Sequence, residues 1–276
     1  MHLLQFRDLV QIALKEDLTQ GDVTTDHIFT NELATASIIT REAGVVAGLD
    51  VAGEVFNQVD PSIKIEKICL DGTAIKPGDQ LMVMAGEVAS LLKAERTALN
   101  FLQRMCGVAT ATCAAVRAVG DTKTRIVDTR KTTPGLRILE KYAVRMGGGE
   151  NHRFHLGDMV MIKDNHIAGA GSVTEAVQRV RQHARFSVKV EVEVTTMDEV
   201  EEALTNGVDI IMLDNMSNAE MAAAVAHING RTWVEASGGI TLERVRDVAA
   251  TGVDFISLGY LTHGYRALDL SMTLKP

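Results

Sequence analysis

The sequence predicts an α/β protein in which a smaller N-terminal α+β sandwich domain precedes an incomplete (β/α) barrel. Two observations predict this fold. In the second half of the chain, short β-rich runs alternate with helical stretches, a pattern that is typical of a parallel sheet. In the first half, short strands are separated by turns that contain glycine and aspartate. The second half is too short for eight β/α units, which occupy about 250 residues in a closed barrel.

The first elements are predicted from apolar spacing and turn residues. Leu3, Phe6, Val10, Ala13 and Leu14 recur at helical spacing, which predicts an amphipathic helix through about Lys15. We expect residues 16–17 and 21–25 to form a loop. The runs 36–40 and 63–68 have the composition of strands.

A long helical stretch follows from residue 89 to about residue 119. Leu91, Leu99, Leu102 and Met105 give it an apolar face. Gly107, which Val, Ala and Thr follow, is a candidate position for a break between two helices.

The barrel strands are predicted from six short runs that each end in a polar or charged residue or in glycine. They are 125–128, 159–163, 188–193, 210–214, 233–239 and 255–259. A doubly wound open sheet is the alternative. It would need a phosphate-binding glycine turn after an early strand, and Gly147-Gly148-Gly149 does not fit that pattern.

Composition excludes some classes of protein. The net charge of −8 and the pI near 5.5 argue against a general nucleic-acid binder. The N-terminus lacks the pattern of a signal peptide, and no apolar run reaches the length of a membrane span. The three cysteines form no C-x-x-C pair and suit a reducing compartment. We therefore expect a cytoplasmic protein without a nucleic-acid or membrane partner.

Functional residues of a barrel lie at the carboxyl ends of its strands. Here those ends carry cations, carboxylates and backbone N–H donors: Asp128 with Arg130 and Lys131, then Lys163, Glu193, Asp214, Ser237-Gly238-Gly239, and Ser257 with Gly259. This mixture suits a phosphorylated substrate with a metal ion.

Two segments are predicted to bind anions. Arg130-Lys131-Thr132-Thr133-Pro134-Gly135 offers a planar fork, a point charge and hydroxyl donors, although a solvated loop with a Pro-Gly turn is the alternative. His152 and Arg153 follow Gly147-Gly148-Gly149, where glycine would let the backbone approach a ligand. A metal site at His152 and His155 is a weaker interpretation, because no third ligand stands at a diagnostic spacing.

Three further charged positions leave alternatives open. Lys163 is a candidate Schiff-base nucleophile, phosphate contact or structural partner of Asp164. Lys189, Glu191 and Glu193 alternate along one strand and face the same side. If that side is the barrel interior, the carboxylates need partners or a metal, and if it faces solvent they are ordinary surface charges. Glu193 stands nearest the carboxyl end of the strand. Asp214 follows a wholly apolar strand, so it is either a functional carboxylate or the N-cap of the next helix, a position that Asn215 or Ser217 can also fill.

Taken together, the motifs resemble bacterial quinolinate phosphoribosyltransferases of the decarboxylating type. The resemblance runs from end to end of the chain. It rests on segments 16–17 with 21–25, 95–103, 128–137, 140–144, 147–153, 162–166, 235–240 and 261–263.

The resemblance implies a two-domain enzyme. An α/β sandwich comprises residues 1–107 joined by the C-terminal tail 266–276, and the catalytic α/β barrel comprises residues 108–265. Quinolinate and phosphoribosyl pyrophosphate would react, with Mg²⁺ required, to give nicotinate mononucleotide, pyrophosphate and carbon dioxide in NAD biosynthesis. The enzyme would be a homodimer that shares its active site, with Arg96 entering the partner's site.

The resemblance also implies roles for individual residues. Lys131, Glu193 and Asp214 would be catalytic, and Glu193 and Asp214 would also bind metal, partly through substrate. The substrate-binding set is Arg96, Thr129, Arg130, Lys131, His152, Arg153, Lys163, Glu193, Asp214, Ser237, Gly238, Gly239, Ser257, Leu258 and Gly259. Tyr260, Gly264 and Arg266 depart from the family pattern beside the expected phosphate loop.

Competing functions are distinguishable. A related protein associated with molybdenum transport genes would lack parts of the Arg-Lys-Thr-Thr and Lys-Asp-Asn-His segments, which this chain keeps. A Schiff-base aldolase would use Lys163, and borohydride trapping would detect it. A non-catalytic binding protein would have lost charged positions that are filled here.

Overall fold

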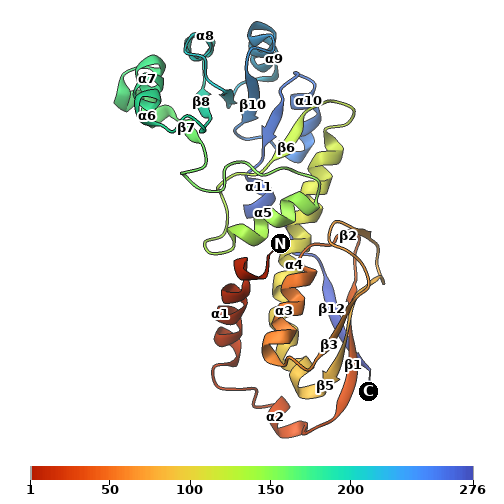
Figure 1. The fold of residues 1–276 in the computed structure, drawn as a ribbon. Helices are drawn as coiled ribbons and strands as arrows, with labels where there is room; N and C mark the ends of the chain where they lie inside the picture. Colours follow the sequence, from red (N-terminus) through yellow and green to blue (C-terminus); the bar gives the residue numbers. More distant parts are fainter. Residues whose placement is uncertain (1, 276) are drawn as a thin grey trace. The chain divides into compact units, whose positions relative to one another are not determined.

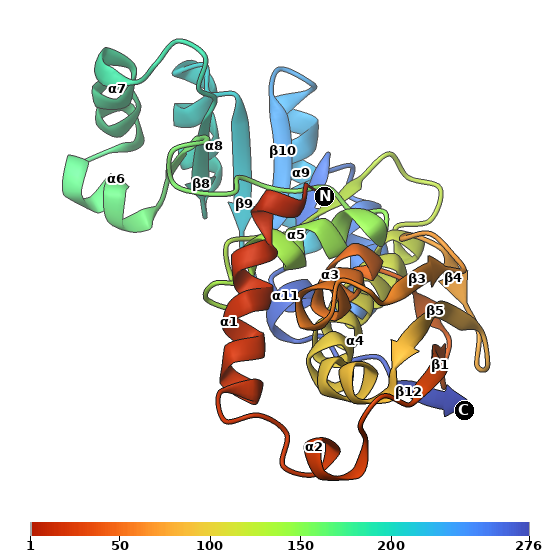
Figure 2. The ribbon, with the colours of Figure 1, turned by 60° about the horizontal axis from the view of Figure 1, so that its bottom comes forward.

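The computed structural model describes residues 2–275 and divides into two compact units. Unit 1 comprises Met1–Cys113, Thr132–Gly148 and Tyr260–Pro276, and unit 2 comprises Ala114–Lys131 and Gly149–Gly259. Unit 1 is therefore assembled from three separate stretches of chain, whose elements are labelled in Figures 1 and 2. The sequence-based division into 1–107 with 266–276 and 108–265 stays a prediction.

Unit 1 contains a four-stranded antiparallel sheet in the order β12-β1-β5-β3. Its strands are β1 (Leu33–Thr40), β3 (Lys64–Lys67), β5 (Gln80–Glu87) and β12 (Leu270–Lys275). Ala36 of β1 pairs with Leu274 on one side and Met84 on the other. A small second sheet pairs β2 (Gly44–Val45) with β4 (Ala74–Ile75). The strands predicted at 36–40 and 63–68 are confirmed.

The helices of unit 1 supply most of its core. They are η1 (Leu3–Gln5), α1 (Arg7–Leu18), α2 (Thr25–Ile28), α3 (Leu49–Val59), α5 (Arg137–Met146) and α11 (Tyr260–His263). In α3, Val51, Val55 and Phe56 are fully buried. The predicted loop at residues 16–17 is wrong, because α1 continues to Leu18. No residue that breaks a helix occurs before Gly21, whose φ is +76°.

The long helix α4 (Val88–Ala118) runs without interruption through Gly107, so the break considered there does not occur. A Cβ at Gly107 would overlap the carbonyl oxygen of Arg266. The glycine therefore lets the C-terminal segment of unit 1 pack directly on the helix backbone. Sequence alone cannot distinguish this use of glycine from a helix break.

Unit 2 is built on a six-stranded parallel sheet in the order β6-β11-β10-β9-β8-β7. The strands are β6 (Arg125–Val127), β7 (Val160–Ile162), β8 (Val190–Val194), β9 (Ile210–Asp214), β10 (Trp233–Ser237) and β11 (Phe255–Ser257). Consecutive strands β7 to β11 are neighbours, and β6 lies beside the last of them, as in a barrel. No pairing joins β6 to β7 in the part of the chain that the structure describes, so the barrel is not closed. The predicted fold class is confirmed.

Helices connect the strands of unit 2, and several of them begin at a side-chain cap. The helices are α6 (Asp164–Ala170), α7 (Val173–His183), α8 (Met197–Thr205), α9 (Asn218–Ile228), η2 (Leu242–Arg244) and α10 (Val245–Ala249). Ser217 caps α9 by accepting the N–H of Glu220 in a capping box. The alternative role of Asp214, as the cap of this helix, is therefore not adopted.

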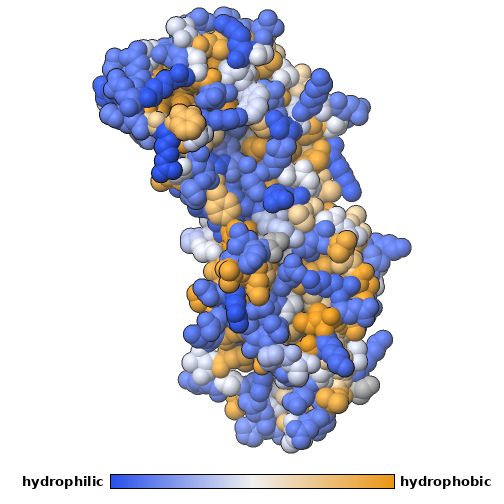
Figure 3. All heavy atoms as spheres, viewed as in Figure 1, coloured by the Kyte–Doolittle hydropathy of each residue, from blue (hydrophilic) through white to orange (hydrophobic). Residues whose placement is uncertain are grey.

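Hydrophobic and hydrophilic residues are interspersed on the face drawn in Figure 3. Among residues 2–275, no helix combines the length and the apolar character that a membrane crossing requires.

Candidate functional site

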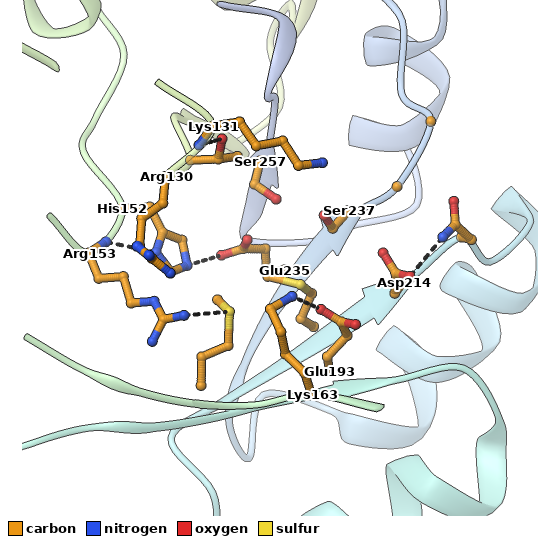
Figure 4. Close-up of a pocket in the computed structure, with 16 residues that line it drawn as sticks. Arg130, Lys131, His152, Arg153, Lys163, Glu193, Asp214, Glu235, Ser237 and Ser257 are labelled. Atoms are coloured by element: carbon orange, nitrogen blue, oxygen red, sulfur yellow. Dashed lines mark hydrogen bonds and ion pairs between the residues drawn. The ribbon is translucent and has the colours of Figure 1, made fainter. Parts of the chain in front are cut away.

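The candidate site is a pocket of about 650 Å³ in unit 2. It lies at the carboxyl ends of the parallel strands, and its polar side chains converge in Figure 4. Its lining comprises Thr129, Arg130, Lys131, His152, Arg153, Met161, Lys163, Glu193, Met212, Asp214, Asn215, Glu235, Ser237, Gly238, Gly239 and Ser257. Every residue of the predicted set except Arg96, Leu258 and Gly259 is part of this lining.

Strand register brings the acidic residues of the pocket to one face of the sheet. Glu193 of β8 and Glu235 of β10 each pair with Met212 of β9, and Asp214 pairs with Ser237 one step further along. Side chains two residues apart on a strand point to the same face. The pocket floor is therefore a short grid of Glu193, Met212 and Glu235, with Asp214 and Ser237 at its outer edge.

Lys163 follows β7 and forms an ion pair with Glu193 of the adjacent strand β8. The alternative partner Asp164 instead begins α6, next in the chain. Figure 4 shows the lysine and the carboxylate meeting at the pocket wall. This pair puts a cation beside one of the two carboxylates for which we predict catalytic and metal-binding roles.

Asp214 is held by the residue that follows it. The side-chain amide of Asn215 donates to Asp214 Oδ2 at 2.7 Å, and the backbone N–H of Asn215 donates to the carbonyl of Ser237 at 3.0 Å. Gly238 packs so closely against Asn215 that a Cβ would overlap its side chain, and its φ is +87°. Glycine is therefore needed at position 238 both for space and for its backbone conformation.

Basic side chains form another part of the pocket lining. Arg130 and Lys131 are exposed, and the hydroxyl of Thr129 accepts the N–H of Lys131 at 3.0 Å. Arg153 donates to the carbonyl of Met159 at 3.1 Å and contacts the sulfur of Met161 at 3.4 Å. Partial burial and the nearby Arg130 lower the pKa of Arg153. An anion bound between these groups would relieve their repulsion.

The segment before Arg153 is anchored by a buried aspartate. Asp128 is fully buried, and its Oδ1 accepts the backbone N–H of His152 at 2.9 Å, while its Oδ2 accepts the side-chain amide of Asn151 at 2.6 Å. Asp128 thus follows β6 at the strand end, as predicted, but its hydrogen bonds go to this loop.

His152 lies against two buried glutamates. Its Nε2 is 3.1 Å from Glu191 Oε2 and 3.5 Å from Glu235 Oε2. Burial by itself would lower the pKa of His152, but the two carboxylates outweigh this effect and raise it to about 10. Burial and the neighbouring Glu235 also raise the pKa of Glu191. The two carboxylates therefore favour a proton on His152 Nε2, the ring nitrogen that faces them.

Some predicted residues lie elsewhere. The side chain of Leu258 is buried in the core, and its N–H donates to the carbonyl of Val127 at 3.0 Å, so that donor is already used. Arg96 is on α4 and lines a different pocket, of about 270 Å³, in unit 1. His155 is exposed and pairs with Asp158 at 3.0 Å, away from the His152 cluster.

The glycine run does not approach the pocket as expected. Gly147 ends α5, and a Cβ on it would overlap the carbonyl of Ala109 in α4. Conversely, the pocket includes four residues that were not predicted, namely Met161, Met212, Asn215 and Glu235. For Glu235 a signal existed, because it stands two residues before Ser237 and a strand alternates with a period of two.

Two groups of residues have the chemistry to hold a metal ion. In the described part of the chain, His152, Glu191 and Glu235 offer ligand atoms that all lie within 4.8 Å of one another. Glu193 and Asp214, on adjacent strands, offer oxygen atoms, which Mg²⁺ prefers. Both residues of the second pair line the pocket, whereas Glu191 of the first group does not, so the second pair is the one fully open to an ion that arrives with a substrate.

Comparisons with known proteins agree along the whole chain. The family models for the N-terminal and C-terminal domains of quinolinate phosphoribosyl transferase match residues 22–106 and 108–273. A probable nicotinate-nucleotide pyrophosphorylase [carboxylating] from Bacillus subtilis is 44% identical over 99% of this chain and 94% of that protein. A quinolinate phosphoribosyltransferase [decarboxylating] 1b from Nicotiana tabacum is 42% identical over 97% of this chain and 82% of that protein.

Solved structures give the same result. The crystal structure of NadC from Streptococcus pyogenes superposes with a TM-score of 0.97 at 44% identity and covers 100% of this chain and 98% of its own. The nicotinate-nucleotide pyrophosphorylase from Francisella tularensis gives a TM-score of 0.96 at 40% identity, with 100% and 98% covered.

Proposed function

Because the chain belongs to the quinolinate phosphoribosyltransferase family, we propose that the pocket of unit 2 is where it performs the family's reaction. The protein is a transferase of NAD biosynthesis that joins quinolinate to the phosphoribosyl group of phosphoribosyl pyrophosphate and releases pyrophosphate and carbon dioxide. The single observation that carries the assignment to this pocket is the meeting of basic residues and carboxylates at the carboxyl ends of adjacent parallel strands.

Quinolinate is a dianion and needs several cations around it. Arg130 and Arg153 are separate guanidinium groups on one pocket, each able to grip a carboxylate with two parallel hydrogen bonds. His152 stands beside Arg153 in the same lining. We assign the two quinolinate carboxylates to these residues, with Arg96 of a second subunit as a further contact.

Transfer of the ribosyl group forms a bond from the pyridine nitrogen to the ribose and breaks the bond to pyrophosphate. Positive charge develops on the ribose in such a step, by analogy with glycoside chemistry. Glu193 and Asp214 lie on adjacent strands in the pocket, where fixed negative charge would stabilise that state and orient the ribose hydroxyls. Lys163, paired with Glu193, keeps that carboxylate in place and contacts the phosphoribosyl group.

The 5′-phosphate suits the outer edge of strands β10 and β11. Ser237, Gly238 and Gly239 have backbone that a phosphate can approach closely, and Ser257 adds a hydroxyl group. Gly259 comes shortly after the carboxyl end of β11. Because the N–H of Leu258 is bonded to Val127, we assign the phosphate chiefly to the Ser237–Gly239 turn.

Decarboxylation breaks the bond between the pyridine ring and one carboxylate, and the ring carbon then takes up a proton. A cation beside the ring stabilises the electron pair that remains on the carbon. Lys131 is the side chain that we assign there, because it is exposed and lines the same pocket as Arg130 and Arg153.

The pocket also fits a divalent cation. Glu193 and Asp214 supply two carboxylates, and Mg²⁺ is typically held by one or two carboxylates together with substrate phosphate oxygens. When bound, the ion neutralises the departing pyrophosphate. Excess EDTA should therefore abolish turnover, and added Mg²⁺ should restore it.

A Schiff-base reaction at Lys163 is less well supported. Its amine is engaged by Glu193, whereas a Schiff-base lysine must attack as a neutral amine. Borohydride treatment with a carbonyl substrate should leave the chain unmodified.

We also expect the enzyme to act in the cytoplasm.

The main test uses purified protein with Mg²⁺, phosphoribosyl pyrophosphate and carboxyl-labelled quinolinate. Labelled carbon dioxide should be released only when phosphoribosyl pyrophosphate is present. No release, or release without it, would refute the assignment.

A second test addresses the shared dimeric site. Arg96→Ala and Lys131→Ala proteins should each be nearly inactive alone, and mixing them should restore part of the activity, because one of the two sites in a hybrid dimer is intact. Mixing that never restores activity contradicts the shared site.

A further inference from the structure

We propose that Glu191 and Glu235 are positioning residues that hold the imidazole of His152 and, through it, orient Arg153 toward a carboxylate of quinolinate. This inference rests on the proposed function. It adds to the site two glutamates that lie beneath the residues expected to touch substrate.

The two glutamates are buried without ordinary compensation. Glu191 is 0% exposed and Glu235 is 2% exposed. Within residues 2–275, both carboxylate oxygens of Glu191 and Oε1 of Glu235 lack a hydrogen-bond partner. Burying a carboxylate costs several kcal/mol of free energy unless a partner or a cation offsets it. Glu191 and Glu235 lie on β8 and β10, the two strands that flank β9. Their burial lowers the stability of the fold, and packing alone does not explain it.

The group that faces both carboxylates is the His152 ring. Its Nε2 lies 3.1 Å from Glu191 Oε2 and 3.5 Å from Glu235 Oε2. Figure 4 shows the ring and Glu235 pointing toward each other at the pocket floor. A ring N–H between two acceptors has one preferred orientation, which rotation of the ring would lose.

The other ring nitrogen links this cluster to Arg153. The backbone N–H of Arg153 donates to His152 Nδ1 at 2.7 Å, and the backbone N–H of His152 donates to Asp128 at 2.9 Å. The ring therefore accepts a hydrogen bond at Nδ1 and lies within ion-pair distance of both carboxylates at Nε2, and its orientation sets the direction in which the chain presents Arg153. The guanidinium of Arg153 is then held by Met159 and Met161 at the pocket wall.

The charges that surround the cluster agree with this arrangement. Arg153 is attracted to Glu191 and to Asp158 and repelled by Arg130, so the buried Glu191 favours one position of its guanidinium. Without negative charge in the pocket floor, repulsion between Arg130 and Arg153 would move the two guanidinium groups apart. Positioning of this kind matters because a displacement of about 1 Å in a substrate contact can cost about a hundredfold in rate.

The first experiment compares three variants with the wild-type enzyme. Glu235→Gln keeps the size of the side chain and removes its charge, and we expect it to raise KM for quinolinate about tenfold, with KM for phosphoribosyl pyrophosphate unchanged within twofold. Quinolinate affinity measured by calorimetry should fall to the same extent. Glu235→Asp, which keeps the charge, should recover part of the loss. Glu243→Gln, an exposed glutamate of unit 2, is the control and should change neither constant.

The second experiment tests whether the glutamate acts through the histidine. In a His152→Ala background, Glu235→Gln should weaken quinolinate binding by less than twofold, because the residue that it positions is absent. Losses that multiply in the double variant overturn the proposal. Equal changes in both KM values also overturn it, since they indicate a general disturbance of the pocket.

Two safeguards keep the result interpretable. If Glu235→Gln does not fold, Glu191→Gln tests the same contact from the other strand. Elemental analysis of the purified wild-type enzyme should find no stoichiometric transition metal, and a metal that disappears in Glu235→Gln would replace the positioning role by a metal site. Wild-type release of carbon dioxide tests the proposed function separately, so a fully active wild-type enzyme with an unaffected Glu235→Gln variant refutes this inference alone.

Discussion

Two fully buried glutamates, one in each unit, have opposite surroundings. In unit 1, Glu140 is fully buried, yet its carboxylate accepts hydrogen bonds from the Arg104 guanidinium and from the backbone N–H of Thr133. In unit 2, the equally buried Glu191 has neither oxygen in a hydrogen bond within residues 2–275. A satisfied buried charge stabilises one arrangement of the chain, whereas an unsatisfied one weakens the fold and points to a function.

The largest effect on catalysis should come from Asp214→Asn, a substitution in the pocket of unit 2. The substitution removes one negative charge at the outer edge of the pocket with little change in shape, so we expect kcat to fall about 100- to 1,000-fold. The apparent free energy of unfolding should change by less than about 0.5 kcal/mol, because Asp214 is only partly buried. Steady-state kinetics and urea unfolding measure the two effects.

Asp198→Asn is the matched control for that change. Asp198 is an exposed residue in the first turn of α8, and its substitution should leave kcat unchanged. A large loss of stability in Asp214→Asn would indicate a structural rather than a catalytic carboxylate.

Glu140→Ala should have the largest effect on stability. It leaves the Arg104 guanidinium and the N–H of Thr133 without their acceptor, and breaking a buried ion pair in this way costs about 3–5 kcal/mol. Urea unfolding followed by circular dichroism measures the change. A loss below about 1 kcal/mol would remove the contrast between the units.

The same measurement on Glu235→Gln should give a much smaller change, of about 1 kcal/mol or less in either direction. The substitution removes one of two carboxylates that crowd a single imidazole, and Glu191 remains to face His152. A loss as large as that of Glu140→Ala would show that the cluster in unit 2 supports the fold in the same way as the ion pair in unit 1.

The smallest expected effect concerns Glu42, on the turn that follows β1. The backbone N–H of Asp269, together with Arg266, holds the pKa of this carboxyl below its ordinary value of 4.5. A lowered pKa stabilises the folded state above pH 4.5, and this contribution disappears as the pH falls through the lowered value.

Glu42→Gln should therefore lower stability by about 0.5–1 kcal/mol at pH 7, a modest amount because Arg266 is largely exposed. Unfolding curves of the variant and the wild type should converge as the pH falls through the lowered pKa. A difference that persists unchanged at low pH would indicate lost packing instead of lost charge.

The sequence predicted the parts of the molecule that depend on local patterns. The strand ends at Lys163, Glu193, Asp214 and Ser237 were identified because a parallel sheet brings such ends to one edge. The family resemblance supplied Arg96 and the C-terminal tail, which no local pattern predicts.

Other features depend on contacts between distant residues and were missed for that reason. Gly107 and Gly147 were interpreted as a helix break and a ligand contact, but each glycine makes room for backbone from another segment. Glu191 was set aside in favour of Glu193, because one strand's alternation does not reveal which of two inward residues meets His152. Alternation put Glu235 on the same face as Ser237, but only the register of three strands shows that it lies beside Met212 in the pocket floor.

The edge strand β12 has a consequence for how the protein is made. It pairs with β1 across more than two hundred residues of chain, because Thr35 faces Lys275 and Thr40 faces Leu270. A ribosome releases β1 early, then all of unit 2, and β12 last. Until then one edge of β1 has open hydrogen-bonding groups, which can pair with another nascent chain. The antiparallel sheet is thus begun first and finished last, while the unit that carries the pocket can complete its own sheet in the interval.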